Sequence, residues 1–173
     1  MIYEIKIDKY VNDRFKVYKS EDDSLVVVGE KVGDPGSYFD AFVNETVSRG
    51  AEFVFYDEAK NEILRIKRHF YSEDKKYVFF EDEKETGHIV SRLEGSDILI
   101  DFDYKNVEEH MSLPKGAKEF YVEGLGRIKS LKQGFKPYEK MEIQVEHEKD
   151  FKLLMAIAVY IWDVFIKNKV AFI

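Results

Sequence analysis

The stretch FKLLMAIAVYIWDVFI, residues 151–166, decides the fold. It contains an unbroken apolar run of ten residues, Leu153–Trp162. A helix that spans a bilayer needs about 20 consecutive apolar residues, and shorter runs are typical of buried core helices. Lys152 and Asp163 also interrupt the stretch, and a charge inside the hydrocarbon of a membrane is costly. The sequence therefore predicts a core helix at about 150–167 and no transmembrane span. A tail anchor and a helix that lies on a membrane surface are the alternatives.

Most of residues 1–147 has the period of two that is typical of strands with one buried and one solvated face. About twelve strands are predicted, roughly at 2–9, 13–19, 24–32, 38–48, 52–57, 62–70, 76–82, 87–93, 97–104, 119–123, 126–132 and 140–147. The segment 38–48 also has helical spacing after a capping serine, so it is either a strand or a short helix. Between these segments the sequence predicts hairpin turns at 57–61, 83–87 and 124–126, and loops at 33–36, 106–117 and 134–137.

The helix and the strands together predict the architecture, because a helix that is apolar on all sides has to be enclosed on all sides. A dozen strands make a barrel too wide for its own side chains to fill, since about eight already leave an interior just wide enough. A helix inside the barrel solves both problems, and closure removes exposed strand edges. We therefore expect one all-β domain over residues 1–173, a closed antiparallel barrel around a buried hydrophobic C-terminal helix. The alternative is a β-sandwich whose last helix packs on one sheet or mediates dimerisation.

Two segments resemble the tubby C-terminal-like superfamily, which includes the tubby proteins, the phospholipid scramblases and the LURP-one-related proteins. The first, FVFYDEAKNEILRIKRHF (53–70), is similar to a hairpin of that group with the turn D-x-x-G-N-E, although Lys60 stands in place of the glycine. The second, MEIQVEHEKDFKLLMAIAVYIWDVF (141–165), resembles the last strand of the group as it enters the core helix. The resemblance, to a small member of the bacterial type, implies the same barrel and a binding role.

Composition and motifs argue against several classes of function. The chain has 27 basic and 34 acidic residues, a formal net charge of −7, which disfavours nucleic acid as a partner. It has no cysteine, which excludes a thiol nucleophile and a thiolate metal site. Its four histidines are scattered, and Asp101 with Asp103 lacks the spacing of a calcium loop. We predict no metal site, no cofactor, no catalytic residues and no enzymatic activity.

Basic residues are concentrated in two places. Residues 115–140 carry a net charge of +4, and a second cluster ends the strand predicted at 62–70. If the two groups converge, they form a cationic patch that anionic headgroups attract by about 1 kcal/mol per residue. The predicted headgroup-binding residues are Arg65, Lys67, Arg68, Arg127, Lys129 and Lys132. The alternative is an ordinary solvated strand face on which these cations lie beside carboxylates.

The function predicted from these features is a non-enzymatic binding module that associates with anionic phospholipid headgroups. The resemblance implies the same role, because tubby-like domains bind phosphoinositides through basic residues on the barrel. The alternative is a soluble protein–protein adaptor or regulator that does not bind lipid. Both functions predict a cytoplasmic protein, which the first also places peripherally at a membrane.

Overall fold

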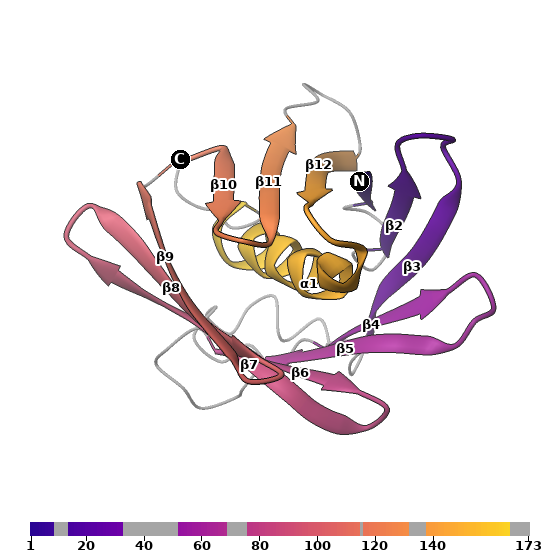
Figure 1. Cartoon of the computed structure of the whole chain (residues 1–173), viewed down its shortest axis with the longest axis horizontal. Coiled ribbons are helices and arrows are strands. Elements are labelled where there is room, and N and C mark those ends of the chain that lie inside the picture. Colours follow the sequence, from indigo (N-terminus) through magenta and orange to yellow (C-terminus); the bar gives the residue numbers. More distant parts are fainter. Residues whose placement is uncertain (9–13, 33–51, 69–75, 115, 132–137, 167–173) are drawn as a thin grey trace, which may run out of the picture.

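A computed structural model gives the structure of the protein for residues 1–8, 14–32, 52–68, 76–114, 116–131 and 138–166. This part of the chain folds into one antiparallel sheet and one helical segment (Figure 1). The strands are β1 (Ile2–Asp8), β2 (Arg14–Lys19), β3 (Leu25–Val32), β4 (Glu52–Asp57), β5 (Glu62–Arg68), β6 (Tyr77–Glu81), β7 (Lys84–Glu94), β8 (Asp97–Tyr104), β9 (Val107–Pro114), β10 (Glu119–Val122), β11 (Gly126–Leu131) and β12 (Tyr138–Val145). The helical segment consists of a 3₁₀ turn (Glu148–Asp150), α1 (Phe151–Ile161) and a π-helical end (Trp162–Ile166).

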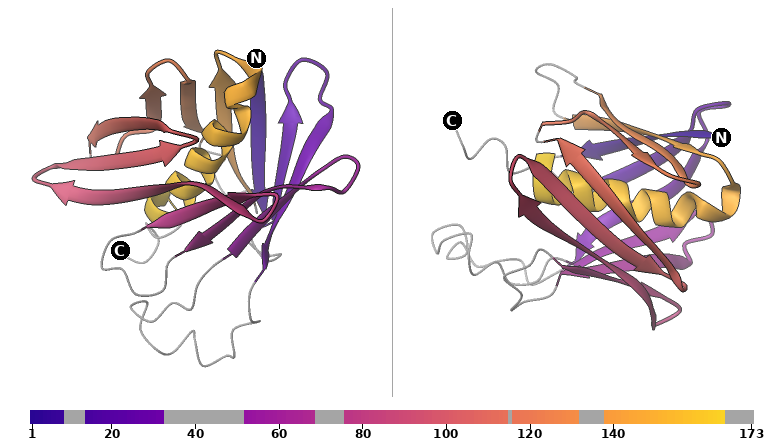
Figure 2. Two further views of the ribbon diagram at one scale, coloured as in Figure 1. Left: turned by 60° about the horizontal axis from the view of Figure 1, so that its bottom comes forward. Right: turned by 60° about the vertical axis from the view of Figure 1, so that its left-hand side comes forward.

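The strands form a nearly closed barrel in the order β10-β11-β12-β1-β2-β3-β4-β5-β6-β7-β8-β9. Strands that follow one another in the chain are neighbours, with the exception of β9 and β10, and β1 also pairs with β12. In the described chain β9 and β10 are the two edges of the sheet, so the barrel has a seam between them. The views in Figure 2 show the sheet curving around α1.

Helix α1 lies against the inner face of the sheet and is buried after its first two residues. Every residue from Leu153 to Ile161 is buried, and Trp162 and Val164 continue the core into the π-helical end. The inward side chains of the strands, such as Phe15, Phe53 and Ile89, complete the same cluster. Since the helix is enclosed, the prediction of a core helix is confirmed. Among the described residues, no helix is long and apolar enough to cross a membrane.

The predicted strands outside 38–48 are confirmed, with ends that differ by a few residues. The loop predicted at 106–117 is wrong, because Val107–Pro114 forms β9. Only Met111 and Leu113 of that strand are buried, and two buried residues did not stand out as a periodic pattern. The turn predicted at 83–87 is also wrong. The turn between β6 and β7 consists of Asp82 and Glu83 alone. Their φ values are 49° and 62°, which lie in the left-handed region that favours glycine.

The other two predicted turns are confirmed. Asn61 donates a backbone hydrogen bond of 2.8 Å to the Asp57 carboxylate across the β4–β5 turn. Lys60 has a φ of 64° there, the conformation that suits the glycine it replaces in the resembled pattern. Gly124 and Gly126 lie in the β10–β11 hairpin. The predictions for 33–36, 38–48 and 134–137 fall outside the described residues.

Candidate functional site

The predicted headgroup-binding residues lie on two sides of the barrel. Arg65 and Lys67 point outward from β5, and Arg127 and Lys129 point outward from β11. Five strands, β12, β1, β2, β3 and β4, separate β5 from β11 in the sheet. Figure 1 shows the two strands on opposite sides of α1, so the structure does not bring the two groups together.

Arg68 does not share the surface of its neighbours. It lies directly opposite Tyr77 in the pairing of β5 with β6, and the Tyr77 side chain faces the barrel interior. Because successive side chains of a strand alternate between its faces, Arg68 is on the inner side at the end of β5. Lys132 lies outside the described residues.

Carboxylates neutralise the cations of β5. Glu62 accepts hydrogen bonds from Nε and Nη2 of Arg65 at 2.8 and 2.6 Å, and Glu52 accepts one from Nη1. These bonds with Glu62 and Glu52 raise the pKa of Arg65. Lys67 lies 3.6 Å from Glu52 as well. This side of the barrel therefore matches the alternative of an ordinary solvated face.

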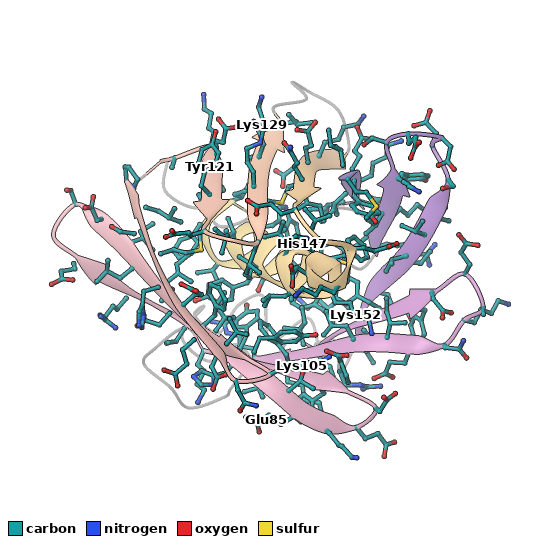
Figure 3. All side chains as sticks on the ribbon, viewed as in Figure 1. Glu85, Lys105, Tyr121, Lys129, His147 and Lys152 are labelled. Atoms are coloured by element: carbon teal, nitrogen blue, oxygen red, sulfur yellow. The ribbon has the colours of Figure 1, made fainter. Side chains whose placement is uncertain are left out.

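The cations of β11 are balanced less completely. Arg127 donates to Glu119 at 2.9 Å and to the amide oxygen of Gln144 at 2.8 Å. Lys129 is directly opposite Glu119 on one neighbouring strand and Glu142 on the other. It is exposed, however, and makes no ion pair within the described chain. Figure 3 shows Lys129 on the outer side of β11, pointing away from α1.

Strand pairing places three lysines side by side next to this group. Lys6 of β1 is directly opposite Lys140 of β12 on one side and Lys16 of β2 on the other. Opposite residues on one face have Cβ atoms about 4.5–5.5 Å apart, and like charges in such positions destabilise a sheet. We call Lys140, Lys6 and Lys16 the lysine row.

The carboxylate of Glu4 forms ion pairs with two lysines of the lysine row. Lys140 and Lys6 lie 2.9 and 3.4 Å from the carboxylate of Glu4. Lys6 also lies over the ring of Tyr18, with Nζ 4.3 Å from the ring centroid. Lys16 is exposed and makes no ion pair within the described chain. The positive charge of the row is thus only partly neutralised.

The lysine row and the β11 cations belong to one continuous outer surface, formed by β10, β11, β12, β1 and β2. We call it the basic face. Its cations are Arg127, Lys129, Lys140, Lys6, Lys16 and Arg14, and its carboxylates are Glu119, Glu142, Glu4 and Asp8. Six cations against four carboxylates leave a net charge of +2, on a chain whose net charge is −7. The charge of the basic face is therefore opposite in sign to that of the whole chain.

The sequence did not reveal the lysine row, because its members lie at residues 6, 16 and 140. The alternation of each strand predicts that these side chains face outward, but only the register places them in one line. A usable signal was the short spacing between the strands predicted at 2–9 and 13–19, because strands so close in sequence usually pair as neighbours.

Two other polar clusters tie the helix to the barrel. At one end, Glu81 accepts hydrogen bonds from Tyr104, from Lys105 at 3.0 Å and from Lys152 at 3.4 Å. Burial alone would raise the pKa of Glu81, but the bonds from Tyr104 and Lys105 outweigh it and lower this pKa. The labelled side chains of Lys105 and Lys152 are visible at this end in Figure 3.

Near the other end of the helix, Tyr77 donates a hydrogen bond to the buried carboxylate of Asp163. Tyr160 donates to the hydroxyl of Ser91 at 2.7 Å. The rings of Tyr77 and Tyr160 meet edge to face, with centroids 4.9 Å apart. The position of Asp163 in the apolar stretch is explained by this network, which holds the π-helical end against β6 and β7.

The other candidates from the sequence are dispersed on the surface. His88 lies on β7, and His147 follows β12. His110 lies 2.7 Å from Asp101, whose other oxygen accepts a bond from Arg92. In the part of the chain that the structure describes, no group of three or more histidine, aspartate or glutamate side chains is placed to hold a metal ion. His69 is outside that part.

Comparison with known proteins adds no further assignment. No protein-family model, no curated protein and no solved structure matches this chain.

Proposed function

We propose that the protein is a non-enzymatic binding module whose basic face binds the headgroups of anionic phospholipids. The observation that carries this proposal is the lysine row, in which Lys6 lies between Lys16 and Lys140 on neighbouring strands. A juxtaposition of like charges costs stability in the isolated protein. An anionic surface that binds across the three ammonium groups removes that cost.

The shape of the basic face favours a surface over a small ligand. Its cations come from four adjacent strands on the outside of a barrel, so they present their charges to one side. Each cation near an anionic membrane contributes about 1 kcal/mol, and the attraction falls off within a Debye length. The resemblance to tubby-like domains points to the same class of ligand. Because the whole chain is acidic, we expect the protein to bind an anionic membrane only when its basic face is turned toward that membrane.

A co-sedimentation experiment with vesicles tests this function. Vesicles of phosphatidylcholine alone are compared with vesicles that also contain phosphatidylserine, at low and at physiological salt. We expect sedimentation with the anionic vesicles only, and less of it at the higher salt. The triple variant Lys6→Gln, Lys16→Gln, Lys129→Gln should bind about 100-fold more weakly, since it loses about 1 kcal/mol per lysine.

The matched control is the triple variant Lys60→Gln, Lys67→Gln, Lys84→Gln. It has the same change in net charge but removes exposed lysines of the β4–β7 side. Its binding should stay close to that of the unmodified chain. Equal losses in the two triple variants would show that binding follows net charge and not the basic face. No sedimentation under any condition would refute lipid binding and leave the protein–protein adaptor as the better hypothesis.

A further inference from the structure

The two edges of the sheet differ in length. Strand β10 has four residues, whereas β9 has eight, Val107–Pro114. A short edge strand offers few backbone groups to a partner, which is one way in which proteins protect an edge. Strand β9 pairs with β8 on one side, and no described strand pairs with its other side. Glu108, His110 and Ser112 are all exposed.

The β8–β9 turn determines which backbone groups of β9 are available. Lys105 and Asn106 form a two-residue turn with φ of 49° and 67°, so Tyr104 and Val107 are a hydrogen-bonded pair. The pairing of the two strands has no irregularity. The N–H and C=O groups of alternate residues from Val107 to Leu113 therefore point to β8. Those of Glu108, His110 and Ser112 point to the unpaired edge.

A surface cleft of about 340 Å³ lies across β7, β8 and β9 and reaches the middle of β9. Its lining residues are Arg92, Leu99, Asp101, His110, Met111 and Ser112, of which the last three are consecutive in β9. Asp101 accepts hydrogen bonds from Arg92 and lies 2.7 Å from Nδ1 of His110. The Arg92 side chain is still 60% exposed, so its remaining N–H groups are available in the cleft.

From these observations we propose that β9 binds an extended segment of a partner protein, which adds to the sheet as a further strand. Backbone bonds to Glu108, His110 and Ser112 supply affinity, and the cleft supplies selectivity for one side chain, as in other sheets that are extended by a peptide. The site lies on β7–β9 and does not depend on the basic face. It gives a structural basis for an adaptor role.

The charges along β9 specify the chemistry of the segment. Glu108 and Glu109 make the first half of the strand acidic, so the segment carries Lys or Arg opposite Glu108. The cleft beside Ser112 offers N–H donors from Arg92, so the side chain opposite Ser112 is an acceptor: Asp, Glu, Asn or Gln. Those two positions are four residues apart. Between them, the side chain opposite Met111 faces the barrel and is apolar, because Met111 is buried.

Panning of a random-peptide phage library against the immobilised full chain tests this inference. We expect enrichment of sequences in which Lys or Arg is four residues from Asp, Glu, Asn or Gln, with an apolar residue next to that acceptor, on the side of the Lys or Arg. In the complex with the most enriched peptide, the amides of Glu108, His110 and Ser112 should exchange with solvent at least tenfold more slowly. Peptides without this pattern, or no change at these amides, would overturn the proposal.

Two variants of one residue provide the sharpest comparison. Ser112→Pro removes an edge-facing N–H without removing a bond to β8, a position where sheets tolerate proline. It should weaken peptide binding at least tenfold, whereas Ser112→Ala, which keeps the N–H, should change it less than twofold. Thermal unfolding verifies that both variants fold. If Ser112→Pro does not fold, Glu108→Lys replaces it, and binding of the basic peptide should again fall at least tenfold. Peptide binding that does not change in the tested variant would contradict the addition of a partner strand at β9.

Discussion

Tyr77 and Asp163 illustrate how single residues fix the helix inside the barrel. Tyr77 is 1% exposed and donates to Asp163, a carboxylate that is 8% exposed. Removing a donor from a buried carboxylate costs about 1–3 kcal/mol. We therefore expect Tyr77→Phe to lower the free energy of unfolding by this amount at neutral pH, as measured by urea denaturation. The control is Tyr3→Phe, because within the described residues the Tyr3 hydroxyl has one hydrogen bond, a weak one to the Met1 sulfur at 3.6 Å. Tyr3→Phe should lower the free energy of unfolding by a much smaller amount.

The same residue gives the protein a sensitivity to alkali. Burial, and then Asp163, raise the pKa of Tyr77, whereas an unfolded tyrosine ionises near pH 10. Below about pH 10 the full stability is present; above it the unfolded state binds fewer protons than the folded state. The free energy of unfolding should then fall by about 1.4 kcal/mol per pH unit for this group. The variant Tyr77→Phe does not have this pH-dependent loss. The difference in free energy of unfolding between the variant and the unmodified chain should therefore become smaller between about pH 10 and 12. A difference in free energy of unfolding that stays constant over this range would contradict the raised pKa of Tyr77.

At the scale of elements, the lysine row predicts two opposite effects from one kind of substitution. Lys16 makes no ion pair in the described chain and faces Lys6, so Lys16→Gln should raise the free energy of unfolding by about 0.2–0.5 kcal/mol. Lys140 bonds Glu4 at 2.9 Å, so Lys140→Gln should lower it by about 0.2–1 kcal/mol. Urea denaturation of both variants measures the difference. A loss of stability in Lys16→Gln would mean that this lysine serves the fold.

The elements also show what the sequence could and could not predict. Alternation located the strands that bury several apolar residues, such as β8, in which Ile98, Ile100 and Phe102 all face the core. It failed for β9, where two buried residues follow a run of polar ones. Arg127 and Lys129 were identified from composition, but the lysines of β1 and β2 join their surface only through the pairing of β1 with β12, across a long sequence separation. Hydrophobic pattern determines which face a side chain occupies, whereas tertiary pairing determines what lies beside it.

For the whole molecule, the helix is the central element of the core. A chain that ends at Lys149 keeps every strand but loses the buried side chains from Leu153 to Val164. We expect it to lack a cooperative thermal transition, because the inward faces of the sheet would enclose a space that they cannot fill. Circular dichroism and the dispersion of amide resonances measure this. Cooperative unfolding of the shortened chain would show that the barrel is stable without its helix.

The order of the elements along the chain has a consequence for biosynthesis. A ribosome translates β1 early and its partner β12 late, and α1 follows every strand. The nascent polypeptide therefore carries its future interior uncovered while most of it has already left the exit tunnel. Pairings between distant segments form slowly, and uncovered strands associate with other chains. Efficient production of this protein should therefore depend on chaperones that act during translation. This dependence should be weakest when β12 and α1 are translated quickly.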